Sequence, residues 1–317
     1  MIYISLLVHE NPEVIINQLE NINKFYDKCE IIMHLSKSSE INDDYMEKLI
    51  KFHGINNVII NPERQNTSWG NVILGHISNI NLIKNTGGQG IIVFHASNDM
   101  LISRGVQDYV TTKKNAFNKR LLMPGGYWWP AHAVFQDKVF VDFINSFGSG
   151  AIFGSQIEGS FYETNILFEI VNLIEKNNLL QSSLHYTREE IFFSTIANAL
   201  GYEPEGFPYV YSEVHCFDRI LWKKFEAIDR ITFIPQNTKN KIKDYLNKKI
   251  FEDGDYRVTT DNIDLILNKN INFLRKNQYL DDGNNIWKIY DVENIYAVKR
   301  VNRDMSDPVR KVISAIQ

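Results

Sequence analysis

Two adjacent carboxylates stand at the start of a predicted helix in the second half of the chain. Thr187-Arg188-Glu189-Glu190 precedes an apolar run, and the spacing fits a capping box in which Thr187 caps the helix and Glu190 reaches back to the cap's amide. The other interpretation is catalytic. One of these carboxylates would point into a cleft and remove a proton from an acceptor hydroxyl, a role that contributes about 10²- to 10⁴-fold in rate. The spacing leaves both interpretations open.

Two adjacent cations, Lys299 and Arg300, follow the apolar run Tyr296-Ala297-Val298 near the end of the chain. In a β conformation successive side chains face opposite sides, so we expect at most one of the two to point inward. The pair is either a solvated surface feature or a device that neutralises a leaving diphosphate. Lys would serve there as a point charge and Arg as a bidentate fork.

Polar clusters follow two predicted strands. The apolar run 91–95 leads into Ala96-Ser97-Asn98-Asp99, and the first strand ends at His9 and Glu10. Open α/β sheets bind ligands at the carboxyl ends of their strands. An Asx-type turn that merely closes the strand is the competing interpretation of Asp99.

Aromatic residues offer a further candidate surface. Trp128, Trp129, Tyr209 and Tyr211 could stack on sugar rings, although aromatic residues are more often core material. The sequence has no Gly-rich phosphate loop, no HExxH and no GxSxG, and no GxGxxG follows the first strand. Nucleotide triphosphatase, zinc protease, serine hydrolase and Rossmann-type oxidoreductase interpretations therefore lose their usual support.

The elements that would position these residues begin with alternating strands and helices. Asn11 as cap and Pro12 at the first helical position predict a helix whose apolar face is Ile15, Leu19, Ile22 and Phe25. The expected strands of the first hundred residues are 2–8, 30–35, 58–60 and 91–95, and the expected helices after the first are 42–52 and 69–84. That order predicts a mostly parallel sheet.

The second half of the chain is less regular. Glycines and prolines in 124–130 predict an irregular loop. We expect a strand at 151–153, helices at 163–177 and 187–200, a strand at 209–214, helices within 239–276 and a terminal hairpin of 286–290 with 295–301. The expected organisation is one compact body, with a main domain at 1–235 and a carboxyl-terminal extension at 236–317.

Composition and charge narrow the class of protein to which the chain can belong. The 34 basic and 38 acidic residues give a net charge of −4, so no overall basic field exists for binding nucleic acid. Cys29 and Cys216 show no metal-ligand or CxxC spacing, which fits a reducing compartment, while a disulfide between them stays open. No basic leader precedes the first strand, and no apolar run reaches the roughly 18 residues of a membrane span. We expect a protein that is soluble or peripheral to a membrane.

Seven segments, in order, resemble the core-2/I-branching β-1,6-N-acetylglucosaminyltransferase and peptide O-xylosyltransferase family. The segments are Leu7-Val8-His9, His34-Leu35-Ser36-Lys37-Ser38, Ser68-Trp69-Gly70, Ala96-Ser97-Asn98-Asp99, Phe153-Gly154-Ser155-Gln156, Glu189-Glu190 with Phe193 and Thr195, and Tyr296-Ala297 with Lys299. They cover nearly the whole chain. Ser36 stands where the family usually has an Asp, Gln156-Ile157 lacks the family's Trp, and the family's cysteines and membrane anchor are missing.

The resemblance implies a GT-A-like, Rossmann-related mixed sheet flanked by helices, and inverting transfer of a GlcNAc- or xylose-type sugar from a UDP-sugar to a glycan hydroxyl. Glu190 would be the general base, with a basic pair in place of a metal ion and no cofactor. The donor contacts would be Val8, His9, Ser36, Trp69, Asp99, Lys299 and Arg300. The acceptor contacts would be Gln156, Glu189, Tyr209 and Tyr211. The extension at 236–317 would complete the donor site.

Two other functions stay open at the level of sequence. One is a metal-dependent transferase of the same fold, with Asp99 as the ligand, although a hard cation usually takes more oxygen ligands than this segment offers. The other is a carbohydrate- or nucleotide-binding protein without turnover. For the transferase we expect a bacterial cytoplasmic protein acting on a glycan or lipid-linked glycan, in solution or at the inner face of the membrane.

Overall fold

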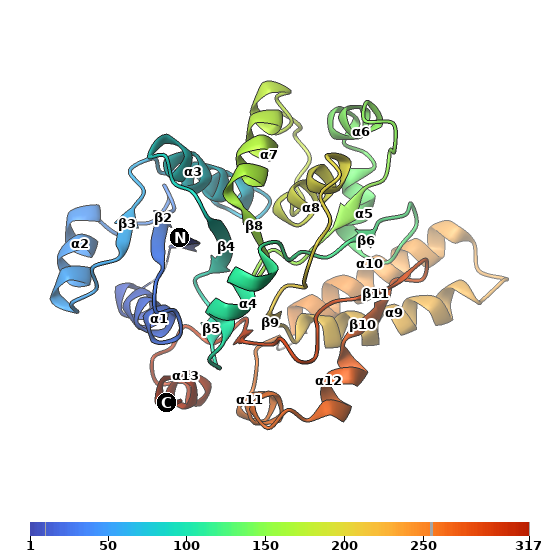
Figure 1. The fold of residues 1–317 in the computed structure, drawn as a ribbon. Helices are drawn as coiled ribbons and strands as arrows, with labels where there is room; N and C mark the ends of the chain where they lie inside the picture. Colours follow the sequence, from blue (N-terminus) through green and yellow to red (C-terminus); the bar gives the residue numbers. More distant parts are fainter. Residues whose placement is uncertain (10, 254–255, 317) are drawn as a thin grey trace.

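The four strands predicted in the first hundred residues form the parallel part of the central sheet. The computed structural model describes residues 1–9, 11–253 and 256–316, so Glu10 lies outside the described residues. The sheet order is β3-β2-β1-β4-β8, with β8 alone antiparallel. Figure 1 shows helices on both sides of this mixed sheet in one α/β body.

The strands are short outside this sheet. In chain order they are β1 (Ile2–Val8), β2 (Glu30–Leu35), β3 (Val58–Ile60), β4 (Ile91–Ala96), β5 (Met100–Leu101), β6 (Arg120–Leu121), β7 (Phe153–Gly154), β8 (Phe161–Glu163), β9 (Val210–Tyr211), β10 (Tyr279–Asp281), β11 (Ile286–Lys288) and β12 (Ala297–Val298).

The helices fill the intervals between the strands. They are α1 (Pro12–Phe25), α2 (Asp43–Phe52), α3 (Val72–Asn85), α4 (Val106–Lys113), α5 (Trp129–Val134), α6 (Lys138–Asn145), α7 (Thr164–Lys176), α8 (Glu189–Ala199), α9 (Val214–Asp229), α10 (Gln236–Asp253), α11 (Thr260–Leu267), α12 (Ile271–Asn277) and α13 (Pro308–Ala315). The described helices include none with the length and apolar character needed to cross a bilayer.

Local signals near the amino terminus are confirmed. The Asn11 side chain accepts a hydrogen bond from the Glu13 amide at 3.0 Å, which caps α1 as its polar type predicts. The predicted apolar face of α1 is buried. Ile4 and Leu6 of β1 belong to the core beneath α1, whereas Tyr3 belongs to the core beneath α3 and α7. The alternation along β1 therefore separates the two layers of helices.

The predicted terminal hairpin is wrong. β11 pairs with β10 instead, and β12 lies between β5 and β9 in a separate three-stranded sheet. The carboxyl-terminal segment thus returns to strands that lie about one hundred and two hundred residues earlier in the chain. A second miss is α9, whose first residue, Val214, had been expected at the end of a strand.

Candidate active site

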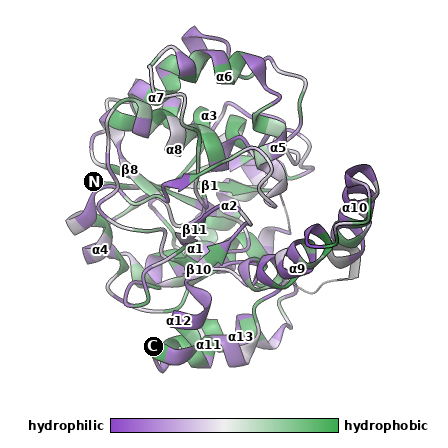
Figure 2. Ribbon diagram, turned by 90° about the vertical axis from the view of Figure 1, so that its right-hand side faces the viewer, coloured by the Kyte–Doolittle hydropathy of each residue, from purple (hydrophilic) through white to green (hydrophobic). Residues whose placement is uncertain are grey.

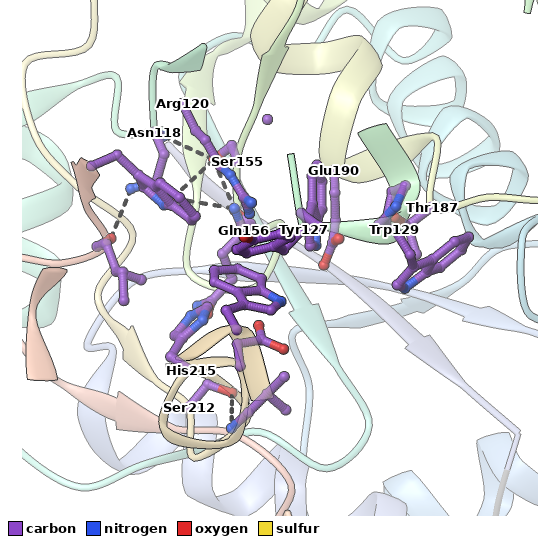
Figure 3. A pocket seen from close by; sticks show the side chains of 18 of the residues that line it. Asn118, Arg120, Tyr127, Trp129, Ser155, Gln156, Thr187, Glu190, Ser212 and His215 are labelled. Carbon is purple, nitrogen blue, oxygen red and sulfur yellow. Dashed lines mark hydrogen bonds between the residues drawn. The ribbon is translucent and has the colours of Figure 1, made fainter. Parts of the chain in front are cut away.

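A cavity of about 430 Å³ lies beyond the carboxyl end of β7 and opens beside the start of α8. Its volume falls in the range of about 300–1,000 Å³ that is usual for ligand sites. All five tryptophans of the chain line it, namely Trp69, Trp128, Trp129, Trp222 and Trp287. Figure 3 shows the polar side chains that share this space, with the Glu190 carboxylate turned into it.

The predicted capping box at the start of α8 does not form. The helix begins at Glu189, its N-cap is Arg188 with helical dihedral angles, and no side chain caps it. The Glu190 side chain lines the cavity together with Thr187. The first turn of α8 presents this carboxylate to a ligand.

The end of β7 fixes the start of α8. The Ser155 amide donates to the Glu190 carbonyl at 2.7 Å, and the Asn118 amide donates to the Ser155 hydroxyl at 2.9 Å. Gly154 has no side chain, and a Cβ there would lie 2.9 Å from Cζ3 of Trp128. The glycine therefore lets this indole lie against the strand that holds the helix in place.

Lys299 and Arg300 both line the cavity, so the expectation that only one faces inward is wrong. β12 ends at Val298, and Arg300 has φ of 65°, which breaks the alternation of a strand. The Lys299 amide donates to the Tyr211 carbonyl at 2.9 Å, and the Val301 amide donates to the Asn98 carbonyl at 3.0 Å. The bent segment that carries the two cations is held on both sides.

Burial, followed by the charges around it, sets the protonation of Glu190. Burial raises the pKa of Glu190 above its ordinary value, with Lys299 opposing and Glu158 adding to the shift. The Lys299 ammonium lies 2.7 Å from a Glu158 carboxylate oxygen. Burial alone would lower the pKa of Lys299, yet Glu158 and Glu190 raise it above its ordinary value. Lys299 therefore stays charged in this low-dielectric site.

A second carboxylate, Asp218, lines the same cavity. Burial raises its pKa to about 7, with the Glu190 charge adding to the shift and Arg120 opposing it. The Arg120 guanidinium lies 3.3 Å from Asp282, 3.5 Å from the Trp287 ring centroid and 4.2 Å from that of Trp128. Arg120 is thus held rigidly by aromatic stacking on one wall.

His215 supplies a hydrogen-bond acceptor. Both donors of the Gln156 amide are used, on the carbonyls of Glu158 and Val210, so its oxygen accepts from Nε2 of His215 at 3.0 Å. Burial, aided by the Lys299 charge, lowers the pKa of His215 to about 3, so the ring is neutral. Its Nδ1 is then an acceptor, and no partner for it is found in the described part of the chain.

A smaller cavity of about 110 Å³ lies where the neighbouring strands β1 and β4 end. The strand order of the sheet reverses between these two strands. His9, Ser97 and Arg303 line it, and so does Glu158, the ion-pair partner of Lys299. The Glu158–Lys299 pair therefore stands between the two cavities. In parallel α/β sheets this edge is the place where ligands bind.

Asp99 lines neither of the two cavities. Its carboxylate accepts a hydrogen bond from the Ala96 amide at 2.8 Å, and its own amide donates to the Ala96 carbonyl at 3.2 Å. These bonds belong to the turn that closes β4. Asp99 therefore has a structural role in this turn. Over residues 1–9, 11–253 and 256–316, no cluster of three or more His, Cys, Asp or Glu side chains could hold a metal ion.

Four further predicted contacts lie in the interior. Val8 and Ser36 join the ends of β1 and β2 through a 3.1 Å backbone hydrogen bond. The Tyr209 hydroxyl lies 2.6 Å from Nε2 of His95, and the Tyr211 hydroxyl donates to Glu213 at 2.6 Å. All four side chains are buried and line neither cavity. They therefore lie outside the candidate site.

Of the predicted site residues, the large cavity brings together Trp69, Gln156, Glu190, Lys299 and Arg300, while His9 lines the smaller one and Glu189 lines neither. Sequence reasoning missed Arg120, His215 and Asp218, which belong to no recognisable motif. The tryptophans carried a usable signal, because Trp128 and Trp129 were already candidates for sugar stacking. Cys29 and Cys216 are both free thiols.

Comparison with models of known protein families and with curated proteins finds no match for this chain. The assignment of a function therefore depends on the chemistry of the cavity.

Proposed function

We propose that this protein is an inverting glycosyltransferase of GT-A-like fold that moves a GlcNAc- or xylose-type sugar from a UDP-sugar to a glycan hydroxyl. The observation that carries the proposal is the meeting, in one tryptophan-lined cavity, of the Glu190 carboxylate with Lys299 and Arg300. Aromatic walls with a few polar groups suit sugar rings, whose apolar faces stack and whose hydroxyls hydrogen-bond. The resemblance to the β-1,6-N-acetylglucosaminyltransferase and O-xylosyltransferase family supports the same chemistry.

In the proposed reaction Glu190 takes the proton of the acceptor hydroxyl while that oxygen attacks the anomeric carbon. The bond from this carbon to the diphosphate oxygen breaks, and its electron pair leaves with UDP. Attack from the face opposite the leaving group inverts the anomeric centre, with one carboxylate as base. Arg300, together with Lys299 once its ammonium moves from Glu158 to a phosphate oxygen, neutralises the departing diphosphate where solvent screening is weak.

In this proposal the uridine end of the donor lies at the smaller cavity, whose volume of about 110 Å³ has room for only part of a nucleotide. This cavity lies at the carboxyl ends of β1 and β4, and the Glu158–Lys299 pair links it to the larger cavity. With the nucleoside near His9, the diphosphate would reach Lys299 and the sugar would lie among the tryptophans, near Glu190. The acceptor would be a glycan or a lipid-linked glycan, and the enzyme would act in the cytoplasm or at the inner face of the membrane.

A panel of UDP-GlcNAc, UDP-xylose, UDP-GalNAc and UDP-glucose tests the proposal. We expect one donor to raise the melting temperature, because a ligand that binds only the native state stabilises it. The same donor should release UDP slowly alone and faster with a sugar acceptor, with inverted configuration in the product by NMR. Activity lost in EDTA and restored by a divalent cation would favour the metal-dependent mechanism. Binding without UDP release would favour a binding protein.

A second candidate is a glycoside hydrolase, and Asp218 is the observation that favours it. An acid held protonated near neutral pH beside an ionised carboxylate is the arrangement that hydrolyses glycosidic bonds, and Asp218, with a pKa of about 7, shares the cavity with Glu190. Cleavage of oligosaccharides in the absence of nucleotide, lost in Asp218→Asn, would establish this function. The transferase predicts no such cleavage.

A further inference from the structure

A groove of about 570 Å³ continues the large cavity toward α9 and α10. These two helices pack against each other and project from the body as a pair (Figures 1 and 2). Tyr127, Trp129 and Asn247 line both spaces. A ligand that begins beside Glu190 can therefore run past Trp129 into this groove, hereafter the α9–α10 groove, without leaving protein contacts.

The charges of the groove are largely compensated. Asp229 accepts hydrogen bonds from the Lys243 ammonium at 2.6 Å and from the Tyr127 hydroxyl at 2.8 Å. Lys243 also lies 5.0 Å from the Tyr127 ring centroid. The lining contains one lysine, Lys243, and two aspartates, Asp229 and Asp244, so the groove has no excess of positive charge for a phosphate chain.

The remaining polar groups of the groove are mostly neutral amides. Gln236, Asn240 and Asn247 lie along α10, roughly one or two helical turns apart. Each amide offers donors and an acceptor, and the rings of Tyr127, Trp129 and Phe225 supply flat apolar surface. Amides beside aromatic rings complement a chain of hydroxyl-bearing rings better than they complement a peptide or a nucleic acid.

We propose that the acceptor is an extended, uncharged oligosaccharide whose terminal sugar enters the Glu190 cavity while the following sugars occupy the α9–α10 groove. This inference rests on the proposed transferase function and specifies its substrate. The groove's volume alone lies within the range of about 300–1,000 Å³ typical of a complete ligand site, so it has room for more than a single hydroxyl group. Neighbouring sugars would be bound there, remote from the reacting bond.

The test compares two asparagines on the same helix. Asn240 lines the groove, whereas Asn237 is also exposed but lines neither cavity. Uncharged oligosaccharides of glucose, xylose and N-acetylglucosamine, each from the monosaccharide to the hexasaccharide, serve as acceptors and as ligands. We expect kcat/KM to rise with chain length in the unaltered enzyme. Asn240→Ala should lower it about tenfold for long acceptors only, and Asn237→Ala should change nothing.

Calorimetric binding of the same oligosaccharides without donor separates this inference from the proposed function. Length-dependent binding that Asn240→Ala weakens and Asn237→Ala does not would support the groove even if no transfer is found. Equal kcat/KM for short and long acceptors, equal effects of the two variants, or no binding by any member of the panel would overturn the inference. If the enzyme transferred sugar to monosaccharides but not to longer acceptors, the proposed function would be supported and the inference about the groove would be wrong.

Discussion

Glu189 and Glu190 are neighbours in the chain, yet the structure gives them different surroundings. Glu190 lines the large cavity, whereas Glu189 is buried beside it and lines neither cavity. Sequence reasoning identified both carboxylates but left the capping box open for Glu190. In the structure Arg188 is the N-cap, has helical dihedral angles and provides no side-chain cap. The Arg188 side chain donates to the carbonyls of Ser182 and Leu184 and to that of Gly70, a contact distant in sequence that no local pattern predicts.

At the residue scale the Glu158–Lys299 pair gives a prediction. Lys299→Met leaves Glu158 buried without its partner, so the unfolding free energy should fall by about 3 kcal/mol in chemical denaturation. UDP affinity should fall in the same variant.

Glu158→Gln with Lys299→Met is the matched control. Removing both charges should restore most of the stability, because no unpaired ion remains, while UDP affinity stays low. Recovery of UDP affinity in the double variant would contradict the placement of Lys299 at the diphosphate.

At the scale of elements, the pairing of β12 with its neighbouring strands was not predictable from the sequence. The apolar run and its strand character were recognised, but its partners β5 and β9 lie far away in sequence, and no local pattern encodes such pairing. The amino-terminal strands and α1 were predictable because alternation, capping and helical periodicity are local signals. The amide and aromatic lining of the α9–α10 groove was missed for the same reason. Tyr127 and Asn247 lie far apart in the chain, and no local pattern brings them together.

Removal of residues 294–317 tests the role of this element. The deletion takes away Val298, Val301 and Ile313, which are buried in the core that also holds Leu221 and Trp222. We expect the shortened chain to lose cooperative thermal unfolding, because β5 and β9 lose the strand between them. A truncated chain that melts cooperatively and still binds UDP would show that residues 294–317 are dispensable.

At the same scale Gly154→Ala should disturb the site without unfolding the protein. The added methyl would lie 2.9 Å from Trp128, so the indole must move. We expect sugar affinity, measured by titration, to fall while the circular dichroism spectrum stays unchanged. Unchanged sugar affinity would argue against Trp128 as a sugar contact.

The whole molecule carries several buried ionisable groups, and they make stability depend on pH. Burial and the neighbouring Glu190 raise the pKa of Glu189 to about 8, and burial raises that of Asp218 to about 7. Between the ordinary carboxyl pKa and these values the native state holds protons that the unfolded state has lost. Stability therefore falls as pH rises through this window.

Glu189→Gln should remove part of this fall. The amide cannot ionise, so the variant should be more stable than the unaltered protein at pH 8, the pKa of Glu189. One pKa unit corresponds to about 1.4 kcal/mol, so we expect the unfolding free energy of the variant to be higher by roughly 1–3 kcal/mol at this pH. Below the ordinary carboxyl pKa the two proteins should be equally stable. Urea unfolding at both pH values measures the difference in unfolding free energy between the variant and the unaltered protein. The same difference at both pH values would contradict the raised pKa of Glu189.

The identity of the base is the claim on which the mechanism depends, and Glu190→Gln tests it against Glu189→Gln. With the donor that binds best and a sugar acceptor, the rate of UDP release should fall by at least about 10²-fold in Glu190→Gln. UDP affinity should stay unchanged in that variant, and Glu189→Gln should keep most of its turnover. Turnover in Glu190→Gln close to that of the unaltered enzyme would contradict the proposed mechanism.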